Sequence, residues 1–507
     1  MPSPETPPAH SLERYLTVLE DLGERAERHF LNREWAELRN LQSLSLEAAD
    51  EALASKAETA PSADAWHRAH AAACRVLGGE PPTGRLRIPV GGRPADSLSP
   101  WMHSTKEHGE GKAVFPLSIQ TGQLRKEARA FAAAKGLSLP EDFAVFPQAF
   151  FRNRRAYVIA GYRDAERGRL FLMAITQKDK GPVVDAVLTS EEEITPVFEF
   201  SRAMLIPRKG TDLSFLPLLE QMLPGKPRWQ LLLNTGFILL GRALLLEELW
   251  RHMKRSRESM EVAPGTPGMV MVVFHLPTFP VVFKIIKDTP DPPKSVGRRE
   301  VLRKYRLVAE HDRVGRLADS HLFENLPFPV DAFKPELLEL LKERCFASLG
   351  FEGSMVFFRE VLVERKMAPL DLVLEESTSD AAALLDEYAA AVEDLAWANI
   401  FPGDLLLKNF GVTRLGRVVF YDYDEVELLT NCFFRRLPDE DGEITSLGPS
   451  DVFPEEWPRF LFRREETRRY FMATHAKIFD PAFWNRCRSL YARGGFIDLF
   501  PYKSQRG

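Results

Sequence analysis

The spacing of apolar residues predicts a first half rich in helices and a second half in which strands and helices alternate. Five residues near the start keep the three- and four-residue spacing of one buried helix face: Leu12, Tyr15, Leu16, Leu19 and Leu22. The same spacing predicts a second helix that carries Phe30, Trp35, Leu38 and Leu41, an alanine-rich third helix in the fifties, a fourth from Trp66 to Leu77 and a fifth from Gln123 to Lys135.

The helical pattern of the first half is interrupted twice. Residues 78–100 are rich in Gly and Pro and are predicted to form a linker or long loop. Further on, the runs Ala156–Ala160 and Leu170–Ile175 predict two strands joined by the polar turn Arg163–Arg169. Helices are expected again from about Leu218 to Met260.

The most apolar run of the chain, Trp229–Trp250, lies within that last helical stretch. It is interrupted by Asn234, Arg242, Glu247 and Glu248, so it is interpreted as a buried helix and not as a membrane span.

In the second half, the apolar runs are shorter and typical of strands. Val270–Phe274 and Val281–Ile286 predict two strands around a turn, and Arg298–Glu310 predicts a helix. A further strand is predicted from Phe357 to Glu364, followed by a hinge at 365–368. Leu384, Leu385, Tyr388, Val392 and Leu395 then line one face of a long helix that leads to Phe401.

Composition narrows the class of protein. The chain has 507 residues, which suggests two to four domains, and 45% of them are apolar, enough for large cores. Its 67 basic and 72 acidic residues give a net charge of −5, which argues against a nucleic-acid scaffold. The four cysteines form no C-x-x-C pair, so neither a zinc site nor a disulfide framework is indicated. With no apolar signal-peptide core in the first thirty residues, we expect a cytoplasmic protein.

The chemistry concentrates in the stretch FPGDLLLKNFGVTRLGRVVFYDYDEV, residues 401–426. Asp404 is followed five residues later by Asn409, and Asp422 follows the strand-like run Val418–Phe420. An Asp, an Asn at +5 and a second Asp after a strand is the pattern of the lower half of a protein-kinase active site. Asp404 can accept the proton of an attacking hydroxyl, while Asn409 and Asp422 supply hard oxygens for Mg²⁺. A single such Asp would more often be a turn or cap residue.

An upper half of such a site lies upstream, in the expected order. It consists of a glycine-containing turn made by Ala263, Pro264, Gly265, Thr266, Pro267, Gly268 and Met269. A glycine turn lets backbone N–H groups approach phosphate closely, although two glycines three residues apart are a weak signal alone. Lys284 follows on a predicted strand and is expected to hold phosphate. Glu300 or Glu310 is the candidate partner of Lys284, and the sequence does not choose between them.

Several stretches of the chain resemble one known family. They include APGTPGMVMVVF, VFKIIKD, EHDRVGRLAD, NIFPGDLLLKNFGVTRLGRVVFYDYDE and GPSDVFPEE. These segments closely resemble the bifunctional isocitrate dehydrogenase kinase/phosphatases of bacteria. The resemblance is dense from about residue 262 to 457. Between about 50 and 145 it is poor, and the N-terminal half looks shorter than is usual in the family.

The resemblance implies an α+β fold with a bilobal kinase-like domain at 261–507, in lobes of about 261–366 and 367–507. A mainly helical regulatory domain with a small β section, 1–260, would precede it. It also implies an ATP-dependent protein serine kinase that is a phosphatase in the same site. The substrate would be isocitrate dehydrogenase, at the branch between the tricarboxylic acid cycle and the glyoxylate bypass. Mg²⁺ (or Mn²⁺) would be the metal and AMP an allosteric effector.

Particular residues acquire roles from this resemblance together with their chemistry. Asp404 would be the general base, Lys408 would neutralise the γ-phosphate, and the glycine turn 263–269 would cover ATP. Asp319 would serve the phosphatase reaction with Asp424 as its helper, although without the resemblance Asp319 would be interpreted as a cap or loop residue. Asp424 and Glu425 stand where protein kinases ordinarily have Phe-Gly, so this acidic run departs from the common pattern.

Two other functions remain open from the residues. One is a kinase-fold phosphotransferase for a small molecule or another protein, without phosphatase activity. The other is a nucleotide-binding regulator without transfer chemistry, against which the complete set Lys284, Asp404, Asn409 and Asp422 argues. No partner nucleic acid or membrane is expected, and the sequence does not indicate an oligomeric state.

Overall fold

The computed structural model describes residues 8–53, 121–164, 167–198, 205–210, 212–311, 314–376, 381–437, 448, 450–495, 497, 500 and 502. These residues form two compact units, the first from residues up to 255 together with 500 and 502, and the second from residues 256–497. Both helices and strands are abundant, which confirms the α+β expectation. None of the helices in the described ranges combines the length and the apolarity required to span a bilayer.

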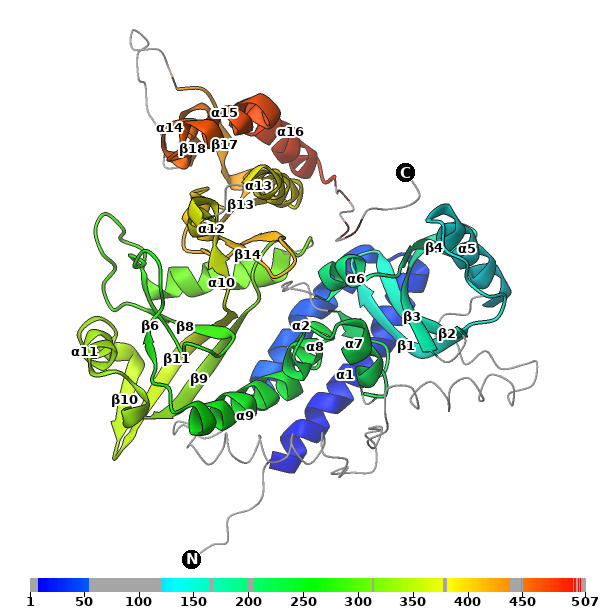
Figure 1. The fold of residues 1–507 in the computed structure, drawn as a ribbon, viewed down its shortest axis with the longest axis horizontal. Coiled ribbons are helices and arrows are strands. Elements are labelled where there is room, and N and C mark those ends of the chain that lie inside the picture. The colour runs from blue at the N-terminus through cyan, green and yellow to red at the C-terminus, as the bar shows by residue number, and fades with distance from the viewer. Residues whose placement is uncertain are drawn as a thin grey trace, which may run out of the picture. The chain divides into compact units, whose positions relative to one another are not determined.

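The first unit contains a five-stranded antiparallel sheet in the order β4-β3-β2-β1-β5 (Figure 1). Its strands are β1 (Ala144–Arg152), β2 (Arg155–Asp164), β3 (Arg167–Lys178), β4 (Gly181–Leu188) and β5 (Ile206–Pro207). The last seven residues of β1 are all buried, so both faces of this strand are covered. Burial on both faces removes the alternation of apolar and polar residues by which a strand is recognised. The β section is therefore larger than predicted, and the turn after β2 is shorter.

Seven helices belong to the first unit: α1 (Pro8–Asn32), α2 (Trp35–Leu53), α5 (Thr121–Ala134), α6 (Glu191–Ile194), α7 (Leu216–Met222), α8 (Arg228–Asn234) and α9 (Ile238–Ser256), counting only the described segments. The prediction that Phe30 and Trp35 share a helix is wrong, because Arg33 adopts a φ of 62° and ends α1. The helices expected from the mid-fifties and at Trp66–Leu77, and the linker at 78–100, lie outside the described residues.

Two residues from the far end of the chain pack on the first unit. The guanidinium carbon of Arg155 lies 4.0 Å from the centre of the Phe500 ring. The Tyr502 hydroxyl donates to Asp185 Oδ2 at 2.8 Å, and Arg155 Nε donates to the same oxygen at 3.0 Å. Because the Arg155 and Asp185 side chains are almost fully buried, these contacts anchor the C-terminal segment firmly to the sheet of the first unit.

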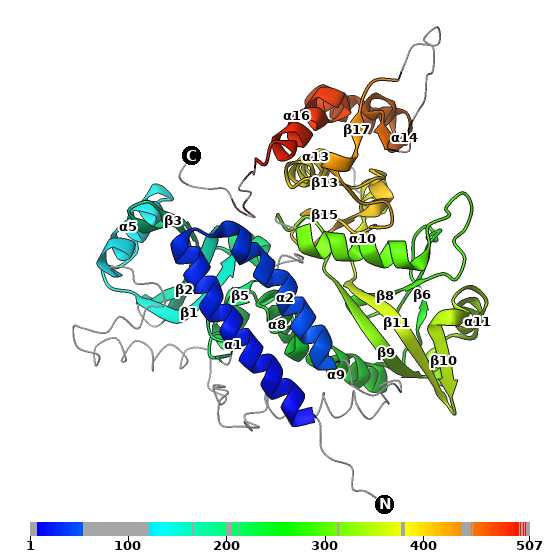
Figure 2. The same ribbon diagram turned by 180° about the vertical axis from the view of Figure 1, so that it is seen from behind.

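The second unit begins with a six-stranded sheet. Strand β11 is central to it: β10 and β8 pair with its two ends, β9 pairs along most of its length, and β7 and β6 continue beyond β8. These strands are β6 (Glu261–Val262), β7 (Met271–His275), β8 (Val281–Ile286), β9 (Ser320–Pro329), β10 (Leu349–Glu352) and β11 (Met355–Arg365). Helix α10 (Arg298–His311) packs on the sheet with Val301, Tyr305 and Val308 (Figure 2), and α11 (Pro335–Arg344) contacts β7. The strand and helix bounds agree closely with the predicted 281–286, 298–310 and 357–364.

The remainder of the second unit is mainly helical, with α12 (Leu370–Glu376), α13 (Ala381–Trp397), α14 (Pro458–Leu461), α15 (Glu465–Thr474) and α16 (Pro481–Ala492). Three small sheets accompany them, formed by β12 (Ala368–Pro369), β13 (Ile400–Phe401), β14 (Phe410–Val412), β15 (Val418–Phe420), β16 (Glu427–Leu428), β17 (Phe433–Phe434) and β18 (Asp451–Val452). The predicted face of α13, including Leu385, Tyr388 and Leu395, is buried in one core with α10 and β15.

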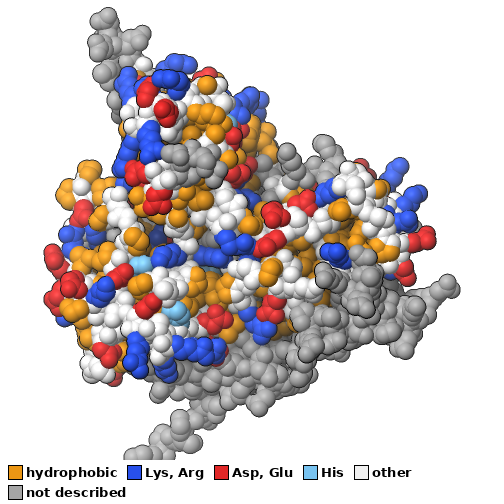
Figure 3. Space-filling model, viewed as in Figure 1, with side chains coloured by type: hydrophobic (Ala, Val, Ile, Leu, Met, Phe, Trp, Pro, Cys, Tyr) orange, Lys and Arg blue, Asp and Glu red, His pale blue; other side chains and the backbone are white. Residues whose placement is uncertain are grey.

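Charges of both signs cover the described surface. On the face drawn in Figure 3, basic and acidic side chains are interspersed and do not separate into large fields. On this face, such mixing fits the small net charge of −5.

Candidate active site

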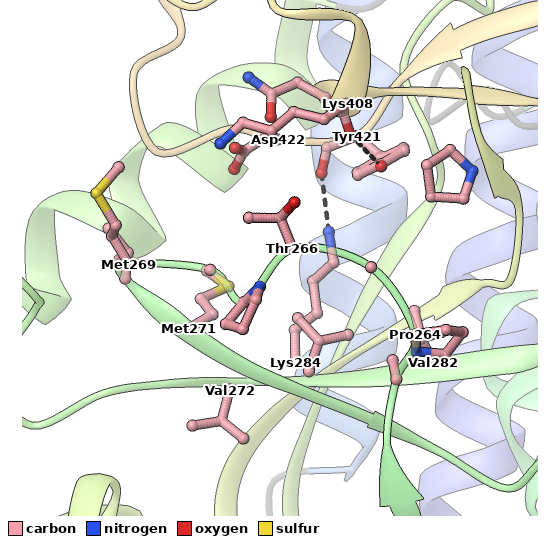
Figure 4. A pocket seen from close by; sticks show the side chains of 18 of the residues that line it. Pro264, Thr266, Met269, Met271, Val272, Val282, Lys284, Lys408, Tyr421 and Asp422 are labelled. Carbon is pink, nitrogen blue, oxygen red and sulfur yellow. Dashed lines mark hydrogen bonds between the residues drawn. The ribbon is translucent and has the colours of Figure 1, made fainter. Parts of the chain in front are cut away.

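A cavity of about 500 Å³ lies within the second unit. One wall is formed by the turn before β7, the strands β7 and β8, and the end of β11, and the other by residues 404–424. Figure 4 shows Val272 and Val282 on the first side and Lys408, Tyr421 and Asp422 on the other. Of the predicted site residues, the seven of the glycine turn, Lys284, Asp404, Lys408, Asn409, Asp422 and Asp424 all line this cavity. Asp319 does not appear among its lining residues.

The glycine turn 263–269 connects β6 to β7. Ala263 N–H donates to the Val273 carbonyl at 2.9 Å, which closes the base of the turn. Gly265 has a φ of 116°, a conformation that side chains rarely adopt, and nothing lies within 4 Å of the position that a Cβ would take. The turn is therefore shaped by backbone geometry and keeps open space on its surface.

Lys284 lies on β8, where it pairs in register with Val273 on one side and Leu362 on the other. Its Nζ lies 2.7 Å from Glu364 Oε2 and donates to the Tyr421 carbonyl at 2.8 Å (Figure 4). The side chain is 9% exposed and that of Glu364 only 1%. A buried ammonium needs such partners, because desolvation without a counter-charge is strongly unfavourable.

The described carboxylate partner of Lys284 is thus Glu364, which the sequence did not indicate. Glu300 pairs instead with Arg303 at 2.6 Å and Lys304 at 3.6 Å on its own helix, and the side chain of Glu310 lies outside the described part of the structure. Glu364 contacts Lys284 because β11 and β8 are neighbours in the sheet. The only signal in the sequence was that β11 carries two acidic residues, Glu360 and Glu364, and nothing in the sequence distinguishes them.

Asp404 lies on a tightly constrained turn. Gly403 has a φ of 82°, and a Cβ there would lie 2.5 Å from the backbone oxygen of Glu425. Asp404 Oδ1 accepts a hydrogen bond from Leu406 N–H at 2.9 Å, and the Asp404 carbonyl accepts one from Asn409 Nδ2 at 3.4 Å. These contacts bring Asp404 and Asn409 to the same part of the cavity.

Asp422 follows β15 and lies among charged groups. Burial raises the pKa of Asp422 to about 7, with a further contribution from the negative charge of Asp424. Lys284 and Lys294 act in the opposite direction. The carboxyl group therefore lies in a place that disfavours its charged form unless a cation is nearby, as expected of a metal ligand or catalytic group.

Lys294 is a cavity residue that sequence reasoning missed. It comes from the loop after β8, and its Nζ lies 3.1 Å from Asp424 Oδ2 and also contacts Glu425. Both carboxylates raise the pKa of the Lys294 ammonium, against the effect of burial. The acidic run that departs from the common kinase pattern is therefore ion-paired within the same chain.

The oxygen atoms of this site suit a hard divalent cation. No group of three or more His, Cys, Asp or Glu side chains in the described ranges is arranged to hold a metal ion. Asn409 and Asp422 nevertheless present oxygen donors in a region where the Asp422 charge lacks full compensation. Mg²⁺ is commonly held by one or two side chains together with water and substrate phosphates, so the residues present fit such an ion.

Asp319 lies just before β9. The preceding residue, Ala318, donates its N–H to the Phe420 carbonyl at 2.9 Å, so this segment runs beside the one that leads to Asp422. The Asp319 carboxylate is held by His321, with Nε2 2.7 Å from Oδ2. The structure therefore places Asp319 on the neighbouring segment and not with the residues on the cavity wall.

Comparison with known proteins gives matches along most of the chain. Residues 258–504 match the family model described as the isocitrate dehydrogenase kinase/phosphatase (AceK) kinase domain, and residues 120–257 match the model of its regulatory domain. Three curated relatives each carry the name isocitrate dehydrogenase kinase/phosphatase.

The relative from Methylibium petroleiphilum is 40% identical over 376 residues, covering 72% of this chain and 61% of the relative. That from Paraburkholderia phymatum is 38% identical, covering 71% and 61%. That from Bordetella bronchiseptica is 37% identical over 418 residues, covering 78% and 67%. The chain thus spans about three fifths of the length of the first two relatives.

Proposed function

The chain belongs to the isocitrate dehydrogenase kinase/phosphatase family, and from this premise we propose that it is an ATP-dependent protein serine kinase and phosphatase. Isocitrate dehydrogenase is the proposed substrate, because it is the one that the names of the relatives specify. One observation carries the proposal: the glycine turn, Lys284, Asp404, Asn409 and Asp422 line one cavity, although 159 residues separate the first from the last, Ala263 from Asp422.

The proposed kinase reaction transfers the γ-phosphoryl group of ATP to a serine hydroxyl. The hydroxyl oxygen bonds to phosphorus, the bond to the β–γ bridging oxygen breaks, and the serine proton passes to Asp404. Lys284 and Lys408 offer positive charge to the phosphates, and backbone N–H groups of the glycine turn approach them. A divalent cation held by Asn409 and Asp422, with Mg²⁺ proposed, would neutralise the charge that develops on the phosphate oxygens.

We further propose that the second unit has the two lobes of a protein kinase, with the six-stranded sheet in the first and α12–α16 in the second. The predicted lobe boundary, near residue 366, coincides with the end of β11 at Arg365. The cavity lies between the glycine turn that precedes β7 and the loop carrying Asp404, as required for a nucleotide bound between two lobes. AMP remains the proposed effector of this activity.

A single incubation tests the proposal. The purified protein is mixed with γ-labelled ATP, Mg²⁺ and isocitrate dehydrogenase, and label in the dehydrogenase is measured with and without AMP. Transfer of label supports the kinase, and release of phosphate from the labelled product after ADP is added supports the phosphatase. No transfer to the dehydrogenase combined with transfer to a small-molecule hydroxyl would favour the small-molecule phosphotransferase instead.

Lys284→Met is expected to reduce kcat/KM for ATP by about tenfold to a thousandfold, because the buried ammonium that faces the phosphates is lost. Lys334→Met is the control, since Lys334 is half exposed and pairs with Glu261 away from the cavity. Steady-state kinetics with varied ATP measures both. Equal kcat/KM values in wild type and Lys284→Met would contradict the role given to Lys284.

Asp319→Ala is expected to lower phosphate release from phosphorylated isocitrate dehydrogenase at least about tenfold while kinase activity survives. The reason is that hydrolysis needs a group to orient water, whose oxygen bonds to phosphorus as the serine–oxygen bond to phosphorus breaks. Asp404 already serves the forward transfer, so a second carboxylate is required.

The control for Asp319→Ala is His321→Gln, which removes the imidazole that holds this carboxylate but leaves the carboxylate itself. It is expected to weaken phosphate release less than Asp319→Ala does. Parallel loss of both activities in Asp319→Ala would indicate a structural Asp, and unchanged phosphate release would remove Asp319 from the mechanism.

A further inference from the structure

Among the described residues, the ammonium group of Lys284 has two hydrogen-bonding partners, and it also lies 5.2 Å from the centre of the Tyr421 ring. Glu364 Oε2 lies 2.7 Å from Nζ, and the Tyr421 carbonyl accepts a hydrogen bond at 2.8 Å. A lysine ammonium has three N–H donors. These two contacts therefore fix the direction of the third donor, and the cavity that Lys284 lines is where a ligand would meet it.

Among the described side chains of helix α10, no carboxylate pairs with Lys284. Tyr305 of this helix is buried, which raises its pKa well above the usual value, and the charges of Glu364 and Asp422 add to that shift. Tyr305 packs edge-on against Tyr423, with ring centres 4.9 Å apart, and its hydroxyl lies 3.7 Å from Met271 Sδ. Helix α10 therefore presents a buried aromatic side chain to this part of the site.

The surroundings of the Glu364 carboxylate are unfavourable for the stability of the fold. Its Oε1 atom is buried and has no hydrogen-bond partner among the described residues. A buried carboxylate with one unpaired oxygen destabilises a fold, and a buried ion pair is often no more stable than an apolar pair of similar volume. A pair that does not improve stability and lines the nucleotide cavity is expected to serve function.

We propose that Glu364 is the positioning residue of the site, a strand carboxylate that holds Lys284 so that its remaining N–H donor meets the phosphates of a bound nucleoside triphosphate. This inference rests on the proposed function, because it assumes that the cavity binds ATP. Glu364 acts through Lys284, and we assign it no contact with the nucleotide itself.

The test is a double-mutant cycle in nucleotide binding, which needs no protein substrate. Binding of a fluorescent N-methylanthraniloyl ATP with Mg²⁺ is measured for wild type, Lys284→Met, Glu364→Gln and the double variant. Each single variant is expected to bind about tenfold more weakly. The double variant is expected to bind no more weakly than Lys284→Met, because Glu364 has no effect once Lys284 is absent.

Two further variants serve as controls. One tests whether the effect depends on the position of the Glu364 charge, and the other tests whether a different carboxylate has the same role. Glu364→Asp keeps the charge but withdraws it by one methylene, and it is expected to weaken binding by a smaller factor than Glu364→Gln. Glu300→Gln removes one of the two helix carboxylates that the sequence offered as partners of Lys284, and it should bind like wild type because Glu300 pairs with Arg303. Melting curves accompany every variant, and Lys284→Met combined with Glu364→Leu is expected to melt no lower than wild type although it binds poorly.

The results distinguish a failure of the proposed function from a failure of the role given to Glu364. If wild type does not bind the fluorescent ATP, the proposed function fails, and the role of Glu364 fails with it. If wild type binds and Glu364→Gln binds equally well, only the role of Glu364 is overturned. Losses that multiply to about a hundredfold in the double variant would also overturn it, since Glu364 would then act independently of Lys284. Weaker binding by Glu300→Gln with no change in Glu364→Gln would assign the role to the helix.

Discussion

Asp422→Asn is expected to lower phosphoryl transfer to isocitrate dehydrogenase by about 10²–10⁴-fold or more, because it removes the carboxylate that we propose holds the divalent cation. The same change should leave the melting temperature at pH 7.5 unchanged or higher. The reason lies in the environment of Asp422, where burial and Asp424 raise its pKa from 3.8 to about 7. A residue that is costly to the fold yet required for activity is typical of an active site.

The pH dependence of stability should show the same effect. The folded protein holds the proton of Asp422 more tightly than the unfolded chain does, so this group makes folding less favourable as pH rises from about 4 to about 7. Asp422→Asn removes that dependence. The folding stability of the variant relative to wild type should therefore increase as pH rises across this interval. A melting temperature that falls at pH 7.5 would contradict the environment described for Asp422.

Asp404→Ala separates proton transfer from nucleotide binding. Its rate of transfer should fall by a similar 10²–10⁴-fold, because the hydroxyl is no longer oriented. The affinity for ATP should stay close to that of wild type, since Asp404 is expected to contact the acceptor hydroxyl. Asp331→Ala, at an exposed position, is the control. Transfer at near wild-type rates by either Asp404→Ala or Asp422→Asn, with an intact fold, would show that the site assignment is wrong.

Gly403→Ala is the second substitution with a large expected effect. The residue has a φ of 82°, and a new Cβ would lie 2.5 Å from both the Cβ and the backbone oxygen of Glu425. Left-handed backbone geometry costs a side chain about 1–2 kcal/mol and forced overpacking about 1–3 kcal/mol, so we expect about 2–5 kcal/mol of destabilisation in all. Any shift that relieves the contact displaces Asp404, and a displacement of about 1 Å can lower a rate about 10²-fold.

Gly416→Ala provides the matched comparison. Gly416 also has a positive φ, 76°, but nothing lies within 4 Å of the position of its Cβ. The Gly416→Ala variant should therefore lose only the stability of about 1–2 kcal/mol that left-handed backbone geometry costs a side chain, and it should keep its activity. Urea unfolding of both variants measures the difference, and equal losses of stability would mean that the contact with Glu425 is unimportant.

The residues that could be predicted from the sequence are those whose chemistry depends on short spacing. Asp404 and Asn409 are five residues apart on one turn, and Asp422 follows a strand that the apolar run 418–420 marks clearly. Lys284 could be found because its strand is bounded by turns on both sides. In each case a local pattern determines where the side chain lies.

The residues that could not be predicted depend on contacts between distant segments. Lys284 meets Glu364 only because β8 and β11 pair, and Lys294 meets Asp424 across 130 residues. Strand β1 escaped notice because it is buried on both faces, and Asp319 was interpreted by resemblance and not from any local signal. The sequence could not name Glu364 as the partner of Lys284, because strand order in the sheet brings β11 beside β8, while Glu300 pairs with Arg303 on its own helix.

The return of the C-terminal segment to the first unit has a consequence for how the two units stay together. Residues 256–497 lie between α9 and the anchored pair Phe500 and Tyr502, so this stretch of the second unit is joined covalently to the first unit at both of its ends. Cutting one of these connections would leave the other to keep the separated halves at a high effective concentration. Release of the chain end after such a cut would require breaking the contacts that Phe500 and Tyr502 make with the buried pair Arg155 and Asp185.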